Sequence, residues 1–110
     1  LVLETGGGLV ILNSCCHAGA DKVVESVLEQ LPGKPVRALI GGFHLMGADG
    51  PATLGPAPEA VLALGERLFS GLDVGGVWTG HCTGAPAFSL LSGAFPGRVH
   101  PLTTGLVLEF

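Results

Sequence analysis

The sequence predicts an α/β fold in which a mostly parallel or mixed sheet packs against helices. Short apolar runs rich in valine, leucine and isoleucine alternate with longer segments whose apolar residues recur at helical spacing. In chain order these segments read β-β-α-β-α-β-α-β-β, an alternation typical of layered α/β proteins. A length of 110 residues suffices for one small domain spanning 1–110, and 47% hydrophobic residues with 13% charged ones indicate a large buried fraction.

The chain opens with a predicted β-hairpin. Residues 1–5 and 9–14 are apolar runs, and Gly6-Gly7-Gly8 between them suits a tight turn. Four successive apolar positions in the second run predict that both of its faces are covered. Asp21 is the expected cap of a first helix, which Pro32-Gly33 ends. The apolar face of that helix falls at positions 23, 24, 27, 28 and 31.

A third buried strand is predicted at residues 36–42. The following residues 45–57 are rich in glycine, proline and alanine and are predicted as a loop. Pro58 suits the first turn of a second helix, on whose apolar face Gly65 allows close packing. Residues 74–80 then form a short predicted strand.

The last third of the chain is predicted as one helix and two terminal strands. Pro86 suits the first turn of the helix, where Phe88, Leu91 and Phe95 share a face. The strands are expected at residues 98–102 and 105–110.

The composition excludes several classes of protein. A net charge of −4 and five scattered basic residues give no nucleic-acid footprint, and no apolar run approaches the roughly 20 residues of a membrane helix. Three cysteines, two of them adjacent, are a poor disulfide framework, which favours the cytoplasm with thiols free or on metal. The chain starts with Leu1 and has no signal-peptide pattern, so we expect a fragment.

Three of the four histidines share one local setting. His17, His44 and His81 each follow an apolar run, precede a turn and have small residues nearby. Side chains at the carboxyl ends of parallel strands converge on one edge of a sheet, where sites are usually built. Three imidazoles there predict a metal site with an open position for water, to which Cys15 or Cys16 can add a thiolate.

Simpler interpretations stay open beside this one. A histidine near a turn often only caps or hydrogen-bonds, and free cysteines are often small core residues, which is the interpretation we favour for Cys82. His100 lies before Pro101, outside the shared setting. A closed structural zinc site is a further alternative, although its usual C-x₂-C spacing is absent. Its ligands would be Cys15, Cys16, His81 and Cys82.

Other catalytic patterns are missing. The sequence contains no G-x-G-x-x-G after a strand, no Walker lysine and no serine nucleophile elbow. The glycine clusters are therefore a weak signal for phosphate binding.

Three strings taken together resemble a known family. NSCCHAG (13–19), IGGFHL (40–45) and GHCTG (80–84) are similar to motifs in the carboxyl-terminal half of the metallo-β-lactamase superfamily. The most similar subgroup is labelled 7,8-dihydropterin-6-methyl-4-(β-ribofuranosyl)aminobenzene 5′-phosphate synthase and reads T-G-C-S-H-x-G, G-G-F-H-L and H-C-T-G. The chain departs from the first motif at Asn13, Ser14 and Cys16.

The resemblance implies a fold, a site and a chemistry. The fold would be one sheet-plus-helices half of a four-layer αββα sandwich. The resemblance carries the metal-ligand role over to Cys15, His17, His44 and His81. The complete enzyme would hold one or two ions of zinc, or of iron or manganese, and metal-bound water or hydroxide would be the nucleophile of a hydrolase. The subgroup label implies a small-molecule substrate that bears phosphate.

One superfamily signature is absent. No two histidines stand two positions apart, so the amino-terminal H-x-H-x-D-H motif is missing. The chain would then be incomplete as an enzyme and would pair with an amino-half partner or with itself. The alternative function is a non-catalytic docking or remnant domain that pairs through its exposed sheet face. No nucleic-acid or membrane partner is expected.

Overall fold

The computed structural model describes residues 1–110 and consists of a five-stranded sheet, a small two-stranded sheet and three α-helices. The strands are β1 (Val2–Thr5), β2 (Gly8–Cys15), β3 (Val36–Gly42), β4 (Met46–Gly47), β5 (Gly50–Leu54), β6 (Val77–Thr79) and β7 (Val99–Pro101). The helices are α1 (Ala20–Gln30), α2 (Pro58–Glu66), the π-helical turn η1 (Arg67–Gly71), the 3₁₀ turn η2 (His81–Thr83) and α3 (Ala85–Ala94).

The main sheet has the strand order β1-β2-β3-β6-β7. β1 and β2 form an antiparallel hairpin, whereas β2, β3, β6 and β7 run parallel to one another. The carboxyl ends of four strands therefore lie along one edge of the sheet. The predicted α/β class with a mixed sheet is confirmed.

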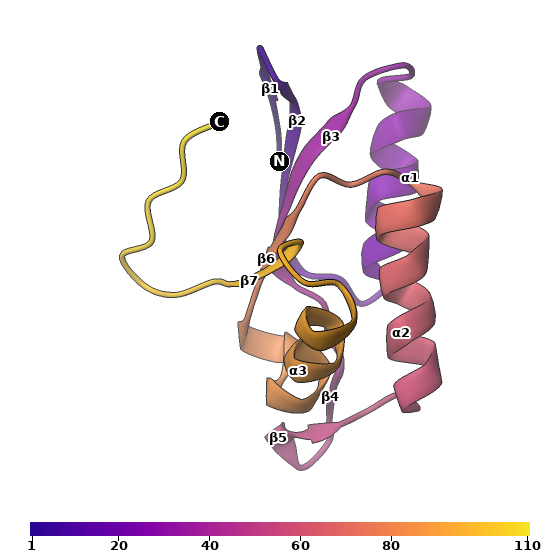
Figure 1. The fold of residues 1–110 in the computed structure, drawn as a ribbon, viewed down its shortest axis with the longest axis vertical. Helices are drawn as coiled ribbons and strands as arrows, with labels where there is room; N and C mark the ends of the chain where they lie inside the picture. The colour runs from indigo at the N-terminus through magenta and orange to yellow at the C-terminus, as the bar shows by residue number, and fades with distance from the viewer.

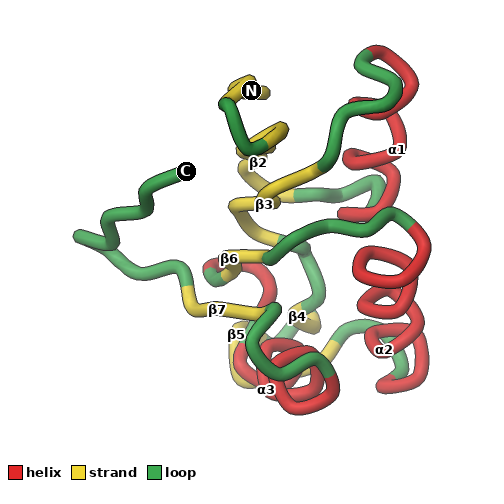
Figure 2. Tube along the Cα trace, turned by 45° about the horizontal axis from the view of Figure 1, so that its top comes forward, coloured by secondary structure: helices red, strands yellow, loops and turns green.

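The hydrophobic core lies between the main sheet and the helices. Leu39 of β3 pairs in register with Ile11 and with Val77, so these three side chains share the face that meets the core. Val24 of α1 and Leu91 of α3 belong to the same buried cluster. Figures 1 and 2 show α1 and α2 on one side of the sheet and the chain after β7 on the other.

Several local predictions are confirmed. Pro58 opens α2, a proline lies in the first turn of α3, and Gly65 is buried against the ring of Phe95. A Cβ atom at Gly65 would lie 2.1 Å from a ring carbon of Phe95, so only glycine permits this approach of α2 to α3.

The predicted cap of α1 is wrong. Gly19 occupies the cap position, and no side chain caps the helix. Asp21 lies inside the first turn, where its carboxylate pairs with the guanidinium of Arg67 at 3.0 Å. Glu25, one turn further along α1, pairs with the same guanidinium, so the ion pairs connect α1 to η1. The carboxylate that we expected to cap the helix therefore pairs with Arg67, a residue distant in the sequence.

The secondary structure of two further segments was predicted wrongly. Residues 45–57 were predicted as a loop, but β4 and β5 pair there as an antiparallel hairpin below the main sheet (Figure 1). Residues 105–110 were predicted as a strand, but they form no strand because no neighbouring strand offers them hydrogen bonds. Leu106 and Val107 are exposed in that segment. The strand predicted at 74–80 is confined to Val77–Thr79.

None of the helices combines the length and the apolar character needed to cross a membrane.

Candidate metal centre

The three predicted histidines occupy equivalent positions on adjacent parallel strands. β2 ends at Cys15, β3 at Gly42 and β6 at Thr79, and a histidine stands two residues after each end. β3 pairs with β2 on one side and with β6 on the other. The sheet register thus brings His17, His44 and His81 to the same edge, where all three side chains are exposed.

Two of these histidines form a pair. The imidazole rings of His17 and His44 are stacked with centroids 3.9 Å apart and an angle of 28° between their planes. The third, His81, belongs instead to a neighbouring cluster of thiols.

The thiol cluster contains Cys15, His81 and Cys82. Their potential ligand atoms all lie within 4.8 Å of one another. The Cys82 thiol donates a hydrogen bond to the Sγ atom of Cys15 at 3.2 Å, and the backbone N–H of His44 donates to the Sγ atom of Cys82 at 3.3 Å. The cluster therefore joins the end of β2 to the turn η2 after β6, and the backbone of His44 after β3 contacts it.

Cys82 reaches Cys15 because the intervening strand ends in glycine. Gly42 of β3 lies in register with Cys15 of β2. A Cβ atom at Gly42 would lie 2.5 Å from the Sγ atom of Cys82, so the cysteine side chain occupies the space that any other residue would fill.

The three cysteines differ in environment. Cys15 is half-buried, and its pKa is raised above its ordinary value, chiefly by the hydrogen bond with Cys82 and also by burial and by the neighbouring charge of Cys82. Cys16 is buried in the core between sheet and helices, and burial is the main cause that raises its pKa to about 11. Cys16 is not part of the thiol cluster.

Two of the candidate residues have left-handed backbone conformations. His44 has φ 54° and His81 has φ 51°, a region that non-glycine residues seldom adopt. Such conformations cost free energy of about 1–3 kcal/mol each and are concentrated at functional sites. Asp73, between η1 and β6, is the third such residue in the chain.

A buried hydroxyl chain fixes the turn that carries His81. The N–H of Phe43 donates to Thr83 Oγ1 at 3.0 Å, the Thr83 and Thr79 hydroxyls are 2.5 Å apart, and Thr79 donates to the carbonyl of Gly41 at 2.8 Å. Each hydroxyl therefore donates once and accepts once. The chain connects the end of β3 to both sides of His81.

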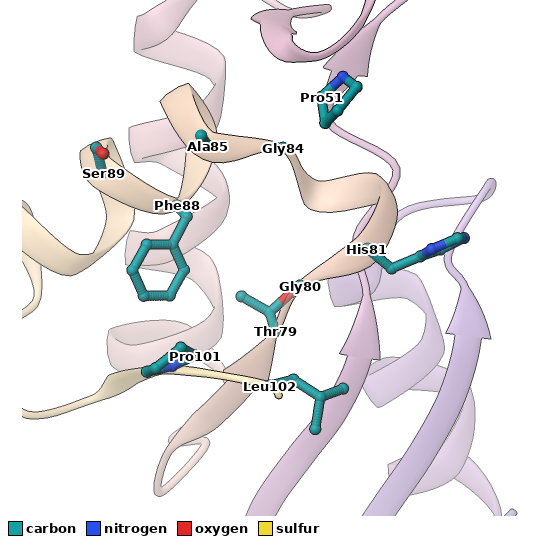
Figure 3. Close-up of a pocket in the computed structure, with 10 residues that line it drawn as sticks. All are labelled: Pro51, Thr79, Gly80, His81, Gly84, Ala85, Phe88, Ser89, Pro101 and Leu102. Carbon is teal, nitrogen blue, oxygen red and sulfur yellow. The ribbon is translucent and has the colours of Figure 1, made fainter. Parts of the chain in front are cut away.

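A cavity of about 310 Å³ opens beside His81. Its wall combines the first residues of α3 with the carboxyl end of β7, as Figure 3 shows, and its lining includes Phe88, Pro101 and Leu102. The imidazole of His81 points away from Phe88 in this view. The cavity is thus a space next to the candidate metal ligands rather than around them.

The residues at this edge fit a transition-metal ion. Thiolate and imidazole are the donors that zinc and related ions prefer, and two thiols and one imidazole are already gathered here. The stacked His17–His44 pair lies next to this cluster, because the N–H of His44 contacts Cys82.

From the sequence we favoured a structural role for Cys82 and named it as a ligand only in the alternative of a closed zinc site, and the structure places it beside Cys15 and His81. The adjacent His81 was the available signal, but chain neighbours usually point in different directions, so only the turn η2 shows that both reach the cluster. His100 stacks on Trp78 with ring centroids 4.8 Å apart and is not among the clustered residues, consistent with its separate setting in the sequence.

Comparisons with known proteins agree with the three motifs. No family profile matches the chain. The chain is 31% identical over all 110 residues to a curated protein of Methanocaldococcus jannaschii, 7,8-dihydropterin-6-methyl-4-(β-D-ribofuranosyl)-aminobenzene-5′-phosphate synthase, and covers 34% of it. It also matches the crystal structure of Tm1679, a metal-dependent hydrolase of the β-lactamase superfamily, with a TM-score of 0.82 and 28% identity over 99% of the chain and 39% of that protein.

In both fold and sequence the chain is similar to proteins of the metallo-β-lactamase superfamily. Its five-stranded sheet and helices correspond to a half domain of that fold. The chain spans 34% of the length of the Methanocaldococcus jannaschii protein and 39% of the length of Tm1679.

Proposed function

We propose that the chain is the carboxyl-terminal part of a metal-dependent hydrolase-type enzyme, completed by an amino-terminal half that carries H-x-H-x-D-H. The observation that carries this proposal is the placement of His17, His44 and His81 two residues beyond three adjacent parallel strands. A metal-dependent hydrolase shares the fold at 28% identity, which supports the same chemistry here.

In this proposal His17, His44, His81 and Cys15 hold or orient the metal, which is zinc, iron or manganese. When bound, the ion supplies Lewis-acid polarisation and lowers the pKa of water for hydrolysis. The protein's own contribution is positional. The hydroxyl chain through Thr79 and Thr83 holds the turn of His81, and the cavity beside His81 offers room for a substrate group.

We infer a small-molecule substrate that bears phosphate, because the name of the Methanocaldococcus jannaschii relative denotes a synthase of a 5′-phosphate compound.

A cytoplasmic location remains a prediction, supported by the three free thiols, which a reducing compartment preserves.

The first test is metal content. Protein purified without chelator is analysed for metal per chain, as wild type and as the variants His17→Ala, His44→Ala and His100→Ala. We expect less metal per chain in His17→Ala and His44→Ala than in wild type, whereas His100→Ala holds the wild-type amount because its ring stacks on Trp78. The wild-type amount of metal in His44→Ala would contradict a ligand role for that histidine.

The second test is activity after completion. The chain is mixed with a separately produced amino-half polypeptide, and hydrolysis of chromogenic phosphodiester and ester substrates is measured. We expect activity that needs both polypeptides and is abolished by His44→Ala but not by His100→Ala. A mixture that forms a stable complex, binds metal and hydrolyses nothing would count against the hydrolase.

A second candidate is a docking domain, favoured by the exposed face of the main sheet. Leu3 pairs in register with Val10, and Ile40 pairs with Leu12 and Trp78, so their side chains lie on the face opposite the core. Leu3 is 48% exposed, and Leu12, Ile40 and Trp78 are only half-buried. An apolar sheet face of this kind is typical of an interaction surface.

The docking candidate predicts association through that face, either with an amino-half chain or with a second copy. Sedimentation of wild type is compared with Leu3→Glu and with Val107→Glu, which changes an equally apolar residue in the terminal segment. We expect Leu3→Glu alone to weaken association. Equal sedimentation of all three proteins as monomers, with and without the amino-half chain, would reject this candidate.

A further inference from the structure

We propose that Cys15, His81 and Cys82 form a thiolate-rich metal half-site that binds a zinc-like divalent cation in this chain alone, without the amino-terminal half. This inference deepens the proposed function, on which its place in an enzyme rests. It replaces the expected structural role of Cys82 with that of a ligand, and it separates these three donors from the His17–His44 pair.

The first argument is proximity across the fold. The three donor atoms come from the end of β2 and from η2, and they lie within 4.8 Å of one another. Two thiolates on a tetrahedral zinc ion are roughly 3.8 Å apart, given Zn–S bonds of about 2.3 Å. The two sulfur atoms here are 3.2 Å apart as hydrogen-bonded thiols, so their separation would have to grow by only about 0.6 Å to reach that spacing.

The second argument is the space made for Cys82. Gly42 leaves room for the sulfur atom to cross β3, and a Cβ atom there would lie 2.5 Å from it. Cys82 is only 2% exposed. Its sulfur atom nevertheless reaches Cys15 on the far side of β3. A cysteine that served only to fill the core would need no partner across the strand.

The third argument is the hydrogen bond from the backbone. The N–H of His44 points at the Sγ atom of Cys82, at 3.3 Å, in a peptide whose φ of 54° is left-handed. Hydrogen bonds to a thiolate favour its charged, metal-binding form. His44 thus contacts one ligand through its backbone N–H while its imidazole stacks on His17.

The donor set selects the class of cation. Two thiolates and one imidazole favour Zn²⁺, Co²⁺ and similar ions over Mg²⁺ and Ca²⁺, which prefer oxygen ligands. Three protein donors leave one position of a tetrahedral ion open, which differs from the closed four-ligand structural site. Cys16 does not complete such a closed site because its thiol is not among the clustered donors.

The test is Co²⁺ binding to the chain under a non-coordinating reductant, read by absorption. Cobalt bound to thiolate has a charge-transfer band in the near ultraviolet, whereas cobalt bound to imidazole alone does not. We expect one Co²⁺ per chain with that band, displaced by Zn²⁺ and not by a large excess of Mg²⁺.

The variants assign the band to residues. Cys15→Ser, His81→Ala and Cys82→Ser should each weaken binding at least about 100-fold, because loss of an outer-shell partner alone costs about 10–100-fold. Cys16→Ser is the matched control and should keep both band and affinity. Circular dichroism checks folding, and Cys82→Ala is the second variant if Cys82→Ser unfolds.

Two results would overturn the inference. One is Co²⁺ bound without a thiolate band, and the other is a folded Cys82 variant that binds as wild type does. These outcomes are distinguishable from failure of the proposed function. In one case the thiolate band is retained in His17→Ala and His44→Ala while the completed enzyme hydrolyses nothing. That pair of results would support the half-site and reject the hydrolase.

Discussion

The Sγ atom of Cys82 lies 3.2 Å from the Sγ atom of Cys15, although 67 positions separate the two residues in the chain. The contact passes over Gly42, the last residue of the strand between them. This relationship connects the ends of β2, β3 and β6 and makes the sheet edge sensitive to small changes at a single glycine.

Gly42→Ala should therefore disturb the thiol cluster. The added methyl group would lie 2.5 Å from the Cys82 sulfur and 3.0 Å from the carbonyl oxygen of Ser14, so one or both must move. We expect a loss of about 1–3 kcal/mol in the free energy of unfolding, measured by urea denaturation. Gly6→Ala is the control, because no atom lies within 4 Å of a Cβ there. Equal stability of the two variants would show that the cluster yields without cost.

Thr83→Val should break the buried hydroxyl chain. It keeps the side-chain shape but leaves the buried N–H of Phe43 without its acceptor. An unsatisfied buried donor costs about 1–3 kcal/mol, which denaturation should detect. Thr83→Ser keeps the hydroxyl and should lose less, and Thr103→Val, in the exposed terminal segment, should change stability little. A Thr83→Val protein as stable as wild type would mean that another group satisfies Phe43.

Two helical glycines should respond to alanine in opposite directions. Gly65→Ala places a methyl group 2.1 Å from the ring of Phe95 and should destabilise the protein by about 1–3 kcal/mol. Gly93 lies in α3 with no atom within 4 Å of a Cβ, so Gly93→Ala should stabilise it by about 0.5–1 kcal/mol. Thermal denaturation of the two variants measures both effects. The same sign for both would contradict the close packing of α2 on α3.

Alkaline pH should lower the free energy of unfolding because the Cys16 thiol is buried. Its folded-state pKa of about 11 exceeds the ordinary value of 9.0, so the folded state keeps its proton while the unfolded state loses it. Stability from this group is complete below about pH 9 and is lost as pH rises toward 11. Urea midpoints of wild type should fall more steeply over that range than those of Cys16→Ala. Parallel curves would indicate that the Cys16 thiol ionises as freely in the folded state as in the unfolded state.

The sequence by itself determined the α/β class, the first two strands, the three helices and the candidate histidines. Hydrophobic periodicity and proline positions are local signals, and parallel strands necessarily bring their carboxyl ends to one edge. Residues 45–57 and 105–110 were predicted wrongly for the opposite reason. Strand formation there depends on whether a partner strand is present, and no local pattern reports that.

Only the tertiary structure decided how the site is divided. It stacked His17 on His44 and placed His81 with Cys15 and Cys82, because the left-handed turns after β3 and β6 set the directions of those side chains. It also paired the carboxylate of Asp21 with Arg67, so that Asp21 does not cap the helix. Backbone turns and long-range partners are properties of the packed chain, and a linear pattern of residue types carries little information about either.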